Sequence, residues 1–204
     1  MLKVGLTGGL ACGKSTIAEM FARRGVHVLS ADRLAHELMF PGKPVYYEVV
    51  QTFGPGVVGP GGEIDRGLLA NAAFGGGRIE ELNRIVHPAV IKAQDEWMDE
   101  IGRREPNAIV MIEAALIIEA GAASHFDKLV VIVCSPYTRV ARLAERMHTN
   151  PESARAEVER RMKFQLPDEK KVEAADYVIR NDGTLDEAEQ QVEQVWGELK
   201  KLVG

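Results

Sequence analysis

The stretch Leu2-Lys3-Val4-Gly5-Leu6-Thr7-Gly8-Gly9-Leu10-Ala11-Cys12-Gly13-Lys14-Ser15-Thr16 decides the fold. Its apolar start, Leu2–Thr7, is typical of a buried strand. The pattern G-x-x-x-x-G-K-[ST] follows directly, and an amphipathic helix then begins at Lys14 and ends near Gly25, where a glycine can adopt the left-handed conformation. In such a loop, backbone N–H groups and the helix N-terminus form a concave site for phosphate oxygens. The stretch therefore predicts a nucleotide-phosphate site, and a plain glycine turn with an exposed lysine is the less favoured alternative.

Each residue type in this loop has an expected role toward a nucleoside triphosphate. The backbone of Gly9, Ala11, Cys12 and Gly13, with the helix start at Thr16, would hold the phosphates. Lys14 would reach the β- and γ-phosphates and act as a catalytic cation, and the Ser15 hydroxyl would coordinate Mg²⁺. The side chain of Cys12 is interpreted as a small packing residue rather than a redox switch.

Four further apolar runs resemble the first one. Each is nearly continuous in apolar residues, which is typical of parallel strands covered by helices on both faces. The sequence therefore predicts an α/β fold with a five-stranded, doubly wound parallel sheet. The four runs are Val26–Ser30, Ala108–Ile112, Lys128–Cys134 and Ala175–Ile179.

The composition is that of an ordinary globular protein. The 204 residues are expected to form one domain, and 46% hydrophobic residues with a net charge of −5 argue against a disordered chain or a nucleic-acid-binding arm. With only Cys12 and Cys134 present, a disulfide framework is not expected, and a reducing cytoplasm is the expected compartment. No run of 18 apolar residues and no secretory leader is visible, so neither a membrane partner nor export is expected.

The segment between the second and third expected strands is too long for one crossover helix. We expect residues 38–106 to form a helical insertion with a role of its own. Asp65 is expected to cap a short helix, and a long helix is expected from Ile79 towards Arg104, with Pro88 starting or kinking its second part.

Acidic residues follow two of the expected strands, where open α/β sheets place their ligands. Asp32 comes after the second strand and could accept the proton of an attacking hydroxyl, or it could simply cap a helix over residues 33–40. His36 lies one helical turn later and is a candidate substrate contact. Glu113 ends the third strand and is a candidate ligand near Mg²⁺, while Glu119 is interpreted as a solvated carboxylate on a helix.

Residues 139–165 hold seven Lys or Arg and four Glu, in a chain that is acidic as a whole. Arg142 and Arg146 share one helical face, and Thr149-Asn150-Pro151 predicts a break between two helices. We interpret this segment as an arginine-bearing lid over the triphosphate, with Arg142 also stabilising charge during transfer. A solvated charged surface is the alternative.

Taken together, these residues resemble the dephospho-CoA kinase family over almost the whole chain. The resemblance rests on the ordered set of motifs rather than on the phosphate loop, which a very large superfamily shares. The motifs are Gly5–Thr16, Asp32-Arg33-Leu34-Ala35-His36, Ile64-Asp65-Arg66, Leu82-Asn83-Arg84-Ile85-Val86-His87-Pro88, Arg142-Leu143 with Arg146, Arg161 and Gln165, and Ala175–Gly183.

The resemblance implies a core like that of nucleoside monophosphate kinases, a helical substrate insertion and a lid. It implies transfer of the ATP γ-phosphate to the ribose 3′-hydroxyl of dephospho-CoA, with Asp32 as the base, His87 in the substrate region and Asn181 near the adenine. A small-molecule substrate and a monomer or weak homo-oligomer are expected. A nucleoside monophosphate kinase, or another small-molecule kinase with this loop, is the alternative. A GTPase-like switch is disfavoured because no Asn-Lys-x-Asp segment occurs. The family commonly has Asp-x-Pro-Leu-Leu-Phe-Glu where this chain has Glu113-Ala114-Ala115-Leu116-Ile117-Ile118-Glu119.

Overall fold

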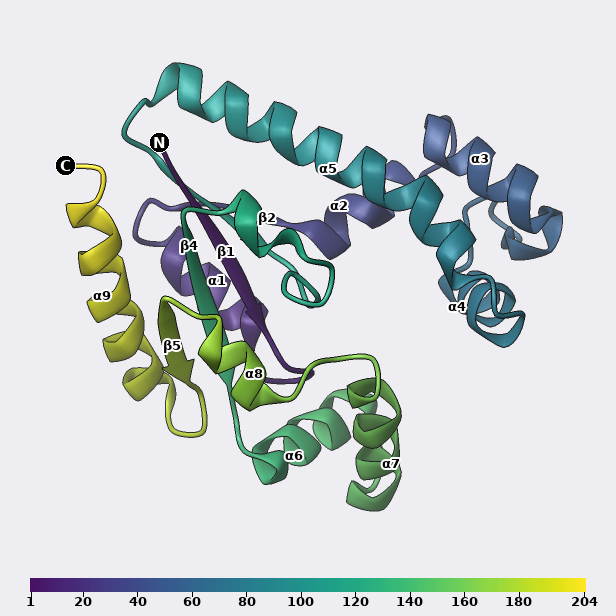
Figure 1. Cartoon of the computed structure of the whole chain (residues 1–204). Helices are drawn as coiled ribbons and strands as arrows, with labels where there is room; N and C mark the ends of the chain where they lie inside the picture. The colour runs from purple at the N-terminus through teal and green to yellow at the C-terminus, as the bar shows by residue number, and fades with distance from the viewer. The chain divides into compact units, whose positions relative to one another are not determined.

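A computed structural model describes residues 1–204, which fold as two compact units (Figure 1). The first unit combines Met1–Leu29 with Ile101–Gly204, and the second is Ser30–Glu100. None of the helices is both long and apolar enough to cross a bilayer. In chain order the elements are β1 (Leu2–Gly8), α1 (Lys14–Ala22), β2 (His27–Ser30), α2 (Ala31–Leu38), α3 (Pro44–Phe53), η1 (Pro55–Val57), α4 (Arg66–Ala70), η2 (Asn71–Gly75), α5 (Ile79–Arg104), β3 (Ile109–Glu113), η3 (Ala122–His125), β4 (Lys128–Val133), α6 (Pro136–Met147), α7 (Pro151–Met162), α8 (Asp168–Glu173), β5 (Tyr177–Arg180) and α9 (Leu185–Lys201).

The five strands form one sheet in the order β2-β3-β1-β4-β5. β1 pairs in parallel with β3, with Leu6 opposite Glu113, and in parallel with β4, with Leu6 opposite Val130. β4 in turn pairs in parallel with β5. The predicted α/β fold with a five-stranded parallel sheet is confirmed. β1 connects to β2 on one side of the sheet, and β3 connects to β4 on the other side. The crevice of this doubly wound sheet therefore lies between β1 and β3, where the two connections diverge.

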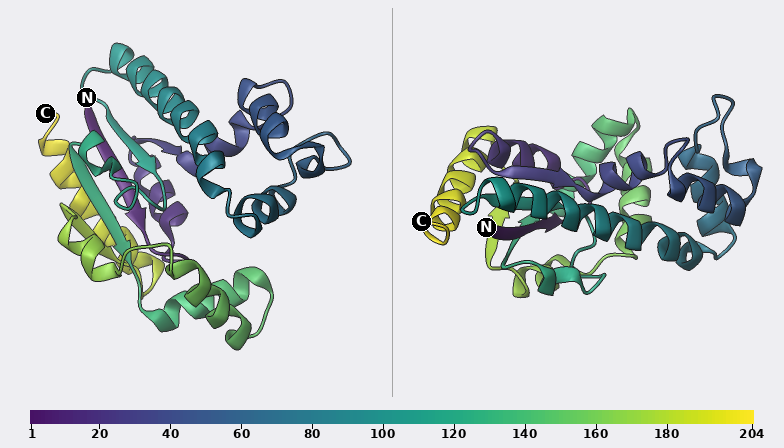
Figure 2. Two further views of the ribbon diagram at one scale, coloured as in Figure 1. Left: turned by 45° about the vertical axis from the view of Figure 1, so that its right-hand side comes forward. Right: turned by 90° about the horizontal axis from the view of Figure 1, so that it is seen from above.

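The three central strands, β1, β3 and β4, are almost entirely buried because both faces of the sheet are covered. On one face, α1 and α9 pack on β1, β3 and β4, with Phe21 and Leu199 fully buried. On the other, Leu129, Val131 and Val133 of β4 pack with Ile117 and with α8. Seen from above in Figure 2, α1 and α9 lie on one side of the sheet and α8 on the other.

The last strand begins two residues later than the sequence predicts. The backbone N–H of Ala175 is still bonded to Val172 at the end of α8 (3.2 Å), so it cannot join the ladder. The N–H of Asp176 makes the first bond to Leu129 (2.9 Å), and the Asp176 carboxylate accepts from the N–H of Leu129 (2.8 Å). Local helix capping therefore decides where β5 starts.

The second unit is helical, with a core of its own around Val49, Ile64 and Val86. The Asp65 carboxylate accepts from the N–H of Leu68 (2.8 Å) and caps α4, as predicted. The long helix is also confirmed, as α5, and Pro88 lies inside it.

The helix after β2 begins earlier than the sequence predicts. α2 starts at Ala31, and Ser30 occupies its N-cap position, so Asp32 lies in the first turn. The interpretation of Asp32 as the cap of a helix over residues 33–40 is therefore wrong. Its carboxylate is still well placed for the positive end of the helix dipole.

The predicted break between two basic helices is confirmed. α6 ends at Met147, His148 takes a left-handed conformation (φ 49°), and the side chain of Asn150 accepts from the N–H of Ser153 (2.8 Å) to cap α7. Leu143 and Ala154 are buried between the two helices, beside Leu10 and Ala11 of the phosphate loop. Figure 1 shows this helix pair next to the end of β4.

Candidate active site

The loop from Gly8 to Gly13 joins the central strand β1 to α1, where backbone shape matters more than side chains. A Cβ at Gly8 would lie 2.3 Å from the carbonyl oxygen of Ile132, so only glycine fits where the chain passes from β1 into the loop. Ala11 (φ 56°) and Gly13 (φ 86°) are both left-handed. Alternation of right- and left-handed residues turns successive N–H groups to one side, which makes an anion-binding concavity. The loop therefore has the backbone form that phosphate binding requires.

Lys14 opens α1 and reaches back over this loop. Its Nζ donates to the carbonyl oxygens of Gly8 (3.0 Å) and Gly9 (3.2 Å). The ammonium group is thereby held at the mouth of the loop, where it adds a positive charge to the backbone N–H dipoles. This is the position in which a cation can contact the terminal phosphates of a nucleotide.

Ser15 and Glu113 meet across the crevice between β1 and β3. The Ser15 hydroxyl donates to Glu113 Oε1 (3.0 Å), and Glu113 is the last residue of β3, only 9% exposed. A hydroxyl and a carboxylate are the hard oxygen donors that Mg²⁺ prefers, and Mg²⁺ takes few protein ligands and keeps several waters. The two candidate metal residues from the sequence are therefore adjacent, and their chemistry fits Mg²⁺.

Asn181 closes the loop from the side of β5. Its Nδ2 donates to the carbonyl oxygen of Cys12 (2.8 Å), and its backbone N–H donates to Val133 (2.9 Å). The residue is 6% exposed, so the amide is committed to the loop. A Cβ at Gly13 would lie 2.4 Å from this Nδ2, which shows how tightly the amide is packed against the loop.

Asp182, the next residue, holds the start of α6 at the same edge of the sheet. Its Oδ1 accepts from the backbone N–H of Ser135 (2.7 Å) and from the hydroxyl of Thr138 (2.8 Å). The Ser135 N–H, with help from Thr138 and the Arg142 cation, holds the pKa of Asp182 below its usual value. The carboxylate thus anchors the helix that carries the basic residues.

The arginines of α6 separate into three environments. Arg139 is 5% exposed and pairs with Asp168 (2.6 Å), so it is part of the folded core and does not face solvent. Arg142 is half-buried, and its Nη1 is enclosed without a hydrogen-bond partner. The same Nη1 lies 3.7 Å from the Cβ position of Gly13, so a free donor points at the phosphate loop. Arg146 is exposed on the last turn.

The interpretation of Glu119 as a solvated carboxylate on a helix is wrong. The residue lies in a turn before η3, its side chain is 13% exposed, and it pairs with Lys171, which is fully buried (3.1 Å). Glu119 also accepts from the N–H of Leu166 (2.9 Å), and Lys171 donates to Gln165 (3.2 Å). This buried ion pair fixes the position of the segment that follows α7. A lysine within Asp168-Glu169-Lys170-Lys171 carries no sequence signal of burial.

The remaining predicted site residues belong to the second unit. Asp32 and His36 lie on α2, one turn apart; Asp32 is exposed, and the His36 ring packs edge-on against Phe40 at 5.0 Å. His87 is exposed on α5, directly before Pro88. Within the first unit the structure thus brings Lys14, Ser15 and Glu113 to the phosphate loop, together with Asn181 and Arg142. Arg146 is not brought into contact with the loop. Within the second unit the base candidate Asp32 lies one helical turn from His36.

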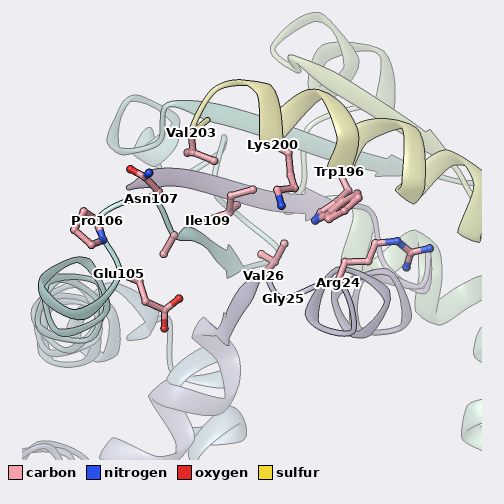
Figure 3. A pocket seen from close by; sticks show the side chains of 11 residues that line it. Arg24, Gly25, Val26, Glu105, Pro106, Asn107, Ile109, Trp196, Lys200 and Val203 are labelled. Carbon is pink, nitrogen blue, oxygen red and sulfur yellow. The ribbon is translucent and has the colours of Figure 1, made fainter.

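A separate cavity of about 410 Å³ opens at the other end of the strands (Figure 3). Val26, just before β2, and Ile109, at the start of β3, form part of its wall, with Trp196 and Lys200 of α9 opposite. The Lys200 ammonium stands over the Trp196 ring (5.2 Å), and Arg24 is already paired with Glu189 and Glu193. Ligands of open α/β sheets bind at the carboxyl ends of the strands, so this cavity is distinct from the phosphate site.

A phosphate loop after the central strand, an acidic residue ending the neighbouring strand and a pair of basic helices after β4 define a P-loop kinase. The particular family follows from comparison with known proteins. The family model for dephospho-CoA kinase matches residues 2–187, and this chain belongs to that family.

Individual relatives agree with this assignment. A dephospho-CoA kinase from Aquifex aeolicus is 39% identical over 202 residues, covering 98% of this chain and 99% of its own length. Among solved structures, TT1252 from Thermus thermophilus has a TM-score of 0.79 at 31% identity and covers 97% of both chains. A dephospho-CoA kinase from Campylobacter jejuni has a TM-score of 0.70 at 25% identity, covering 98% of this chain and 97% of its own.

Proposed function

We propose that this protein transfers the γ-phosphoryl group of ATP to the ribose 3′-hydroxyl of dephospho-CoA, producing coenzyme A and ADP. The observation that carries the proposal is the arrangement around the loop, where Lys14 and the unpartnered Nη1 of Arg142 both face the phosphate loop of a dephospho-CoA kinase family member. Catalysis of phosphoryl transfer consists mainly of positioning and charge stabilisation, and these two cations supply the charge.

The loop residues bind the nucleotide. The backbone of Gly9, Ala11, Cys12 and Gly13 holds the phosphates, and Thr16 adds the start of α1, whose dipole favours negative charge. Arg146, exposed on the same helix as Arg142, contacts the triphosphate when the lid over residues 139–165 engages it. Asn181 keeps the loop in shape through Cys12 and borders the adenine.

Ser15, through its hydroxyl, and Glu113, through its carboxylate, are the residues that would hold Mg²⁺. When bound, the ion neutralises the charge of the β- and γ-phosphate oxygens. The bond between Ser15 and Glu113 keeps both oxygens ready at one point of the crevice (3.0 Å). Removal of the Glu113 carboxylate is expected to weaken Mg²⁺ binding and to leave the phosphate loop intact.

The second unit binds the acceptor, through α2 and through the helical insertion that we place at residues 38–106. Asp32 accepts the proton of the 3′-hydroxyl as it attacks, a role that suits an exposed carboxylate at the first turn of a helix after a strand. His36, on the same helix face, and His87, on α5, contact the substrate. The protein works in the cytoplasm, as a monomer or weak homo-oligomer, without nucleic acid or membrane partners. Its two free thiols are consistent with a reducing compartment.

The test is to identify the product. Purified protein is incubated with ATP, Mg²⁺ and dephospho-CoA, and the products are separated and analysed by mass spectrometry and phosphorus NMR. A product one phosphoryl group heavier than dephospho-CoA, with a ribose 3′-phosphate, supports the proposal. Transfer to a nucleoside monophosphate, with none to dephospho-CoA, would overturn it.

A further inference from the structure

The two cysteines of this chain meet although they are 122 residues apart in sequence. Cys12 lies inside the phosphate loop, and Cys134 directly follows β4. Their Sγ atoms are 2.7 Å apart, and both are free thiols. Cys12 is fully buried and Cys134 is 5% exposed. The phosphoryl-transfer mechanism assigns no role to either sulfur atom.

The surroundings of Cys12 favour its thiolate. Arg139 of α6 points Nη2 at Cys12 Sγ (3.4 Å), and Asp168 of α8, which pairs with Arg139 (2.6 Å), is the other charged group at this point. A hydrogen bond from Cys134 and the charge of Arg139 lower the pKa of Cys12, although burial acts in the opposite direction. The pKa of Cys134 is raised by the hydrogen bond to Cys12 and by burial. One thiol is thus prepared to attack, and the other stays protonated until it is needed.

A change at Cys12 would be felt by the nucleotide site. The carbonyl oxygen of Cys12 accepts from the buried Asn181 amide (2.8 Å), and that amide is packed against Gly13. The next residue after Gly13 is Lys14, whose ammonium group contacts the loop carbonyls. A disulfide needs the two sulfur atoms at about 2.05 Å, so Cys12 has to move roughly 0.7 Å toward β4.

We propose that Cys12 and Cys134 form a reversible disulfide that acts as a redox switch on the phosphate loop, closing in response to hydroperoxide and lowering the affinity for ATP. A displacement of this size is sufficient, because backbone N–H groups bind phosphate oxygens at about 2.7–3.2 Å and such hydrogen bonds weaken when the atoms move apart. Since the switch acts on the nucleotide site, it rests on the proposed kinase function.

The chemistry balances with hydrogen peroxide as the oxidant, a molecule small enough to reach a buried sulfur atom. The Cys12 thiolate attacks one peroxide oxygen, the O–O bond breaks, and the leaving hydroxide takes a proton to become water, leaving a sulfenic acid. The Cys134 sulfur then attacks Cys12 Sγ, the S–O bond breaks, and the leaving hydroxide takes the Cys134 proton. Two thiols lose two electrons and two protons in total, and one peroxide becomes two waters. A dithiol reductant reverses the bond by exchange.

The experiment uses the full chain, with Cys134→Ala as the matched variant. Wild type and variant are treated with graded hydrogen peroxide and then unfolded in urea that contains dimedone, which traps sulfenic acids. Non-reducing peptide mapping, ATP binding by calorimetry and kinase activity are then measured, before and after dithiothreitol. The peptide map and the ATP titration do not require dephospho-CoA, so failure of the switch can be told apart from failure of the proposed function.

For the wild type we expect a peptide linking Cys12 to Cys134, ATP binding weakened tenfold or more, and recovery with dithiothreitol. For Cys134→Ala, whose kinase activity under reducing conditions should equal that of the wild type, we expect no linked peptide and a dimedone adduct on Cys12. The adduct should form more slowly, because the hydrogen bond from Cys134 no longer lowers the pKa of Cys12. A wild type that retains both thiols, or that links between two chains, overturns the proposal. So does a linked peptide that leaves ATP affinity unchanged. The wild-type map alone decides the question if the variant does not fold.

Discussion

Replacing Gly13 with alanine separates backbone strain from crowding at the phosphate loop, because the chain offers a matched control. Gly13 (φ 86°) and Gly25 (φ 83°) have nearly the same left-handed conformation. A Cβ at Gly13 would lie 2.4 Å from Asn181 Nδ2, whereas a Cβ at Gly25 would meet nothing within 4 Å. Gly13→Ala and Gly25→Ala therefore share the strain, and only Gly13→Ala displaces a buried amide.

The expected magnitudes follow from these contacts. The left-handed conformation costs alanine about 1–2 kcal/mol of stability in either variant. In Gly13→Ala the Asn181 amide must also give up its bond to Cys12, and a buried group left without a partner costs a further ~1–3 kcal/mol. We expect Gly13→Ala to remain folded, because domains of this kind have about 5–15 kcal/mol of stability. Its phosphate loop is nevertheless displaced. The loss of one hydrogen bond to a charged phosphate costs about 1.5–3 kcal/mol, so ATP should bind about tenfold or more weakly.

Urea unfolding gives the stability of each variant, and calorimetric titration with ATP gives the affinity. We expect Gly25→Ala to bind ATP as the wild type does and to lose only the stability that the left-handed conformation costs, about 1–2 kcal/mol. Equal losses of stability in the two variants, or unchanged ATP affinity in Gly13→Ala, would show that the Asn181 amide does not shape the loop.

Four other perturbations test the proposed base, the proposed Mg²⁺ residues, the buried ion pair and the cysteine pair. Asp32→Asn should leave ATP affinity unchanged and lower kcat by ~10²–10⁴, the usual loss when a general base is removed; steady-state kinetics with undiminished kcat would exclude the role. Glu113→Gln should raise the Mg²⁺ concentration for half-maximal activity ~10–100-fold, and an unchanged Mg²⁺ titration would remove Glu113 from the metal site. Lys171→Met should lower the free energy of unfolding, measured in urea, by about 3–5 kcal/mol, because the Glu119 carboxylate is then buried without its partner. Adding Glu119→Gln should recover much of this loss. An unchanged free energy of unfolding in Lys171→Met would contradict the pairing. The hydrogen bond from Cys134 and the charge of Arg139 lower the pKa of Cys12 to about 7, so the thiolate fraction of Cys12 increases as the pH rises through that value. The rate of disulfide formation by peroxide should therefore increase ~10-fold from pH 6 to pH 8. A rate that does not change with pH would exclude Cys12 as the attacking sulfur.

The sheet and the phosphate loop were predictable because their signals are local. A continuous apolar strand such as Lys128–Val133 and the glycine pattern before Lys14 can each be interpreted within a few residues. The helix caps at Asp65 and Asn150 are local for the same reason. The order of the motifs along the whole chain then showed the resemblance to a family.

What could not be predicted depends on contacts between distant segments. Glu119 and Lys171 are 52 positions apart, and only the folded chain shows that each neutralises the other in the interior. Arg139 counted as one positive charge of the lid, but Asp168 makes it a buried structural residue. The meeting of Cys12 with Cys134 is likewise a product of strand order, since β1 and β4 are neighbours in the sheet.

The proposed function is the transfer of one phosphoryl group from ATP to the ribose 3′-hydroxyl of dephospho-CoA. The most direct measurement is the ratio of kcat/KM for dephospho-CoA to kcat/KM for nucleoside monophosphates, with ATP and Mg²⁺ held constant. We expect efficient transfer to dephospho-CoA and little to any nucleoside monophosphate. A preference for a nucleoside monophosphate would contradict it.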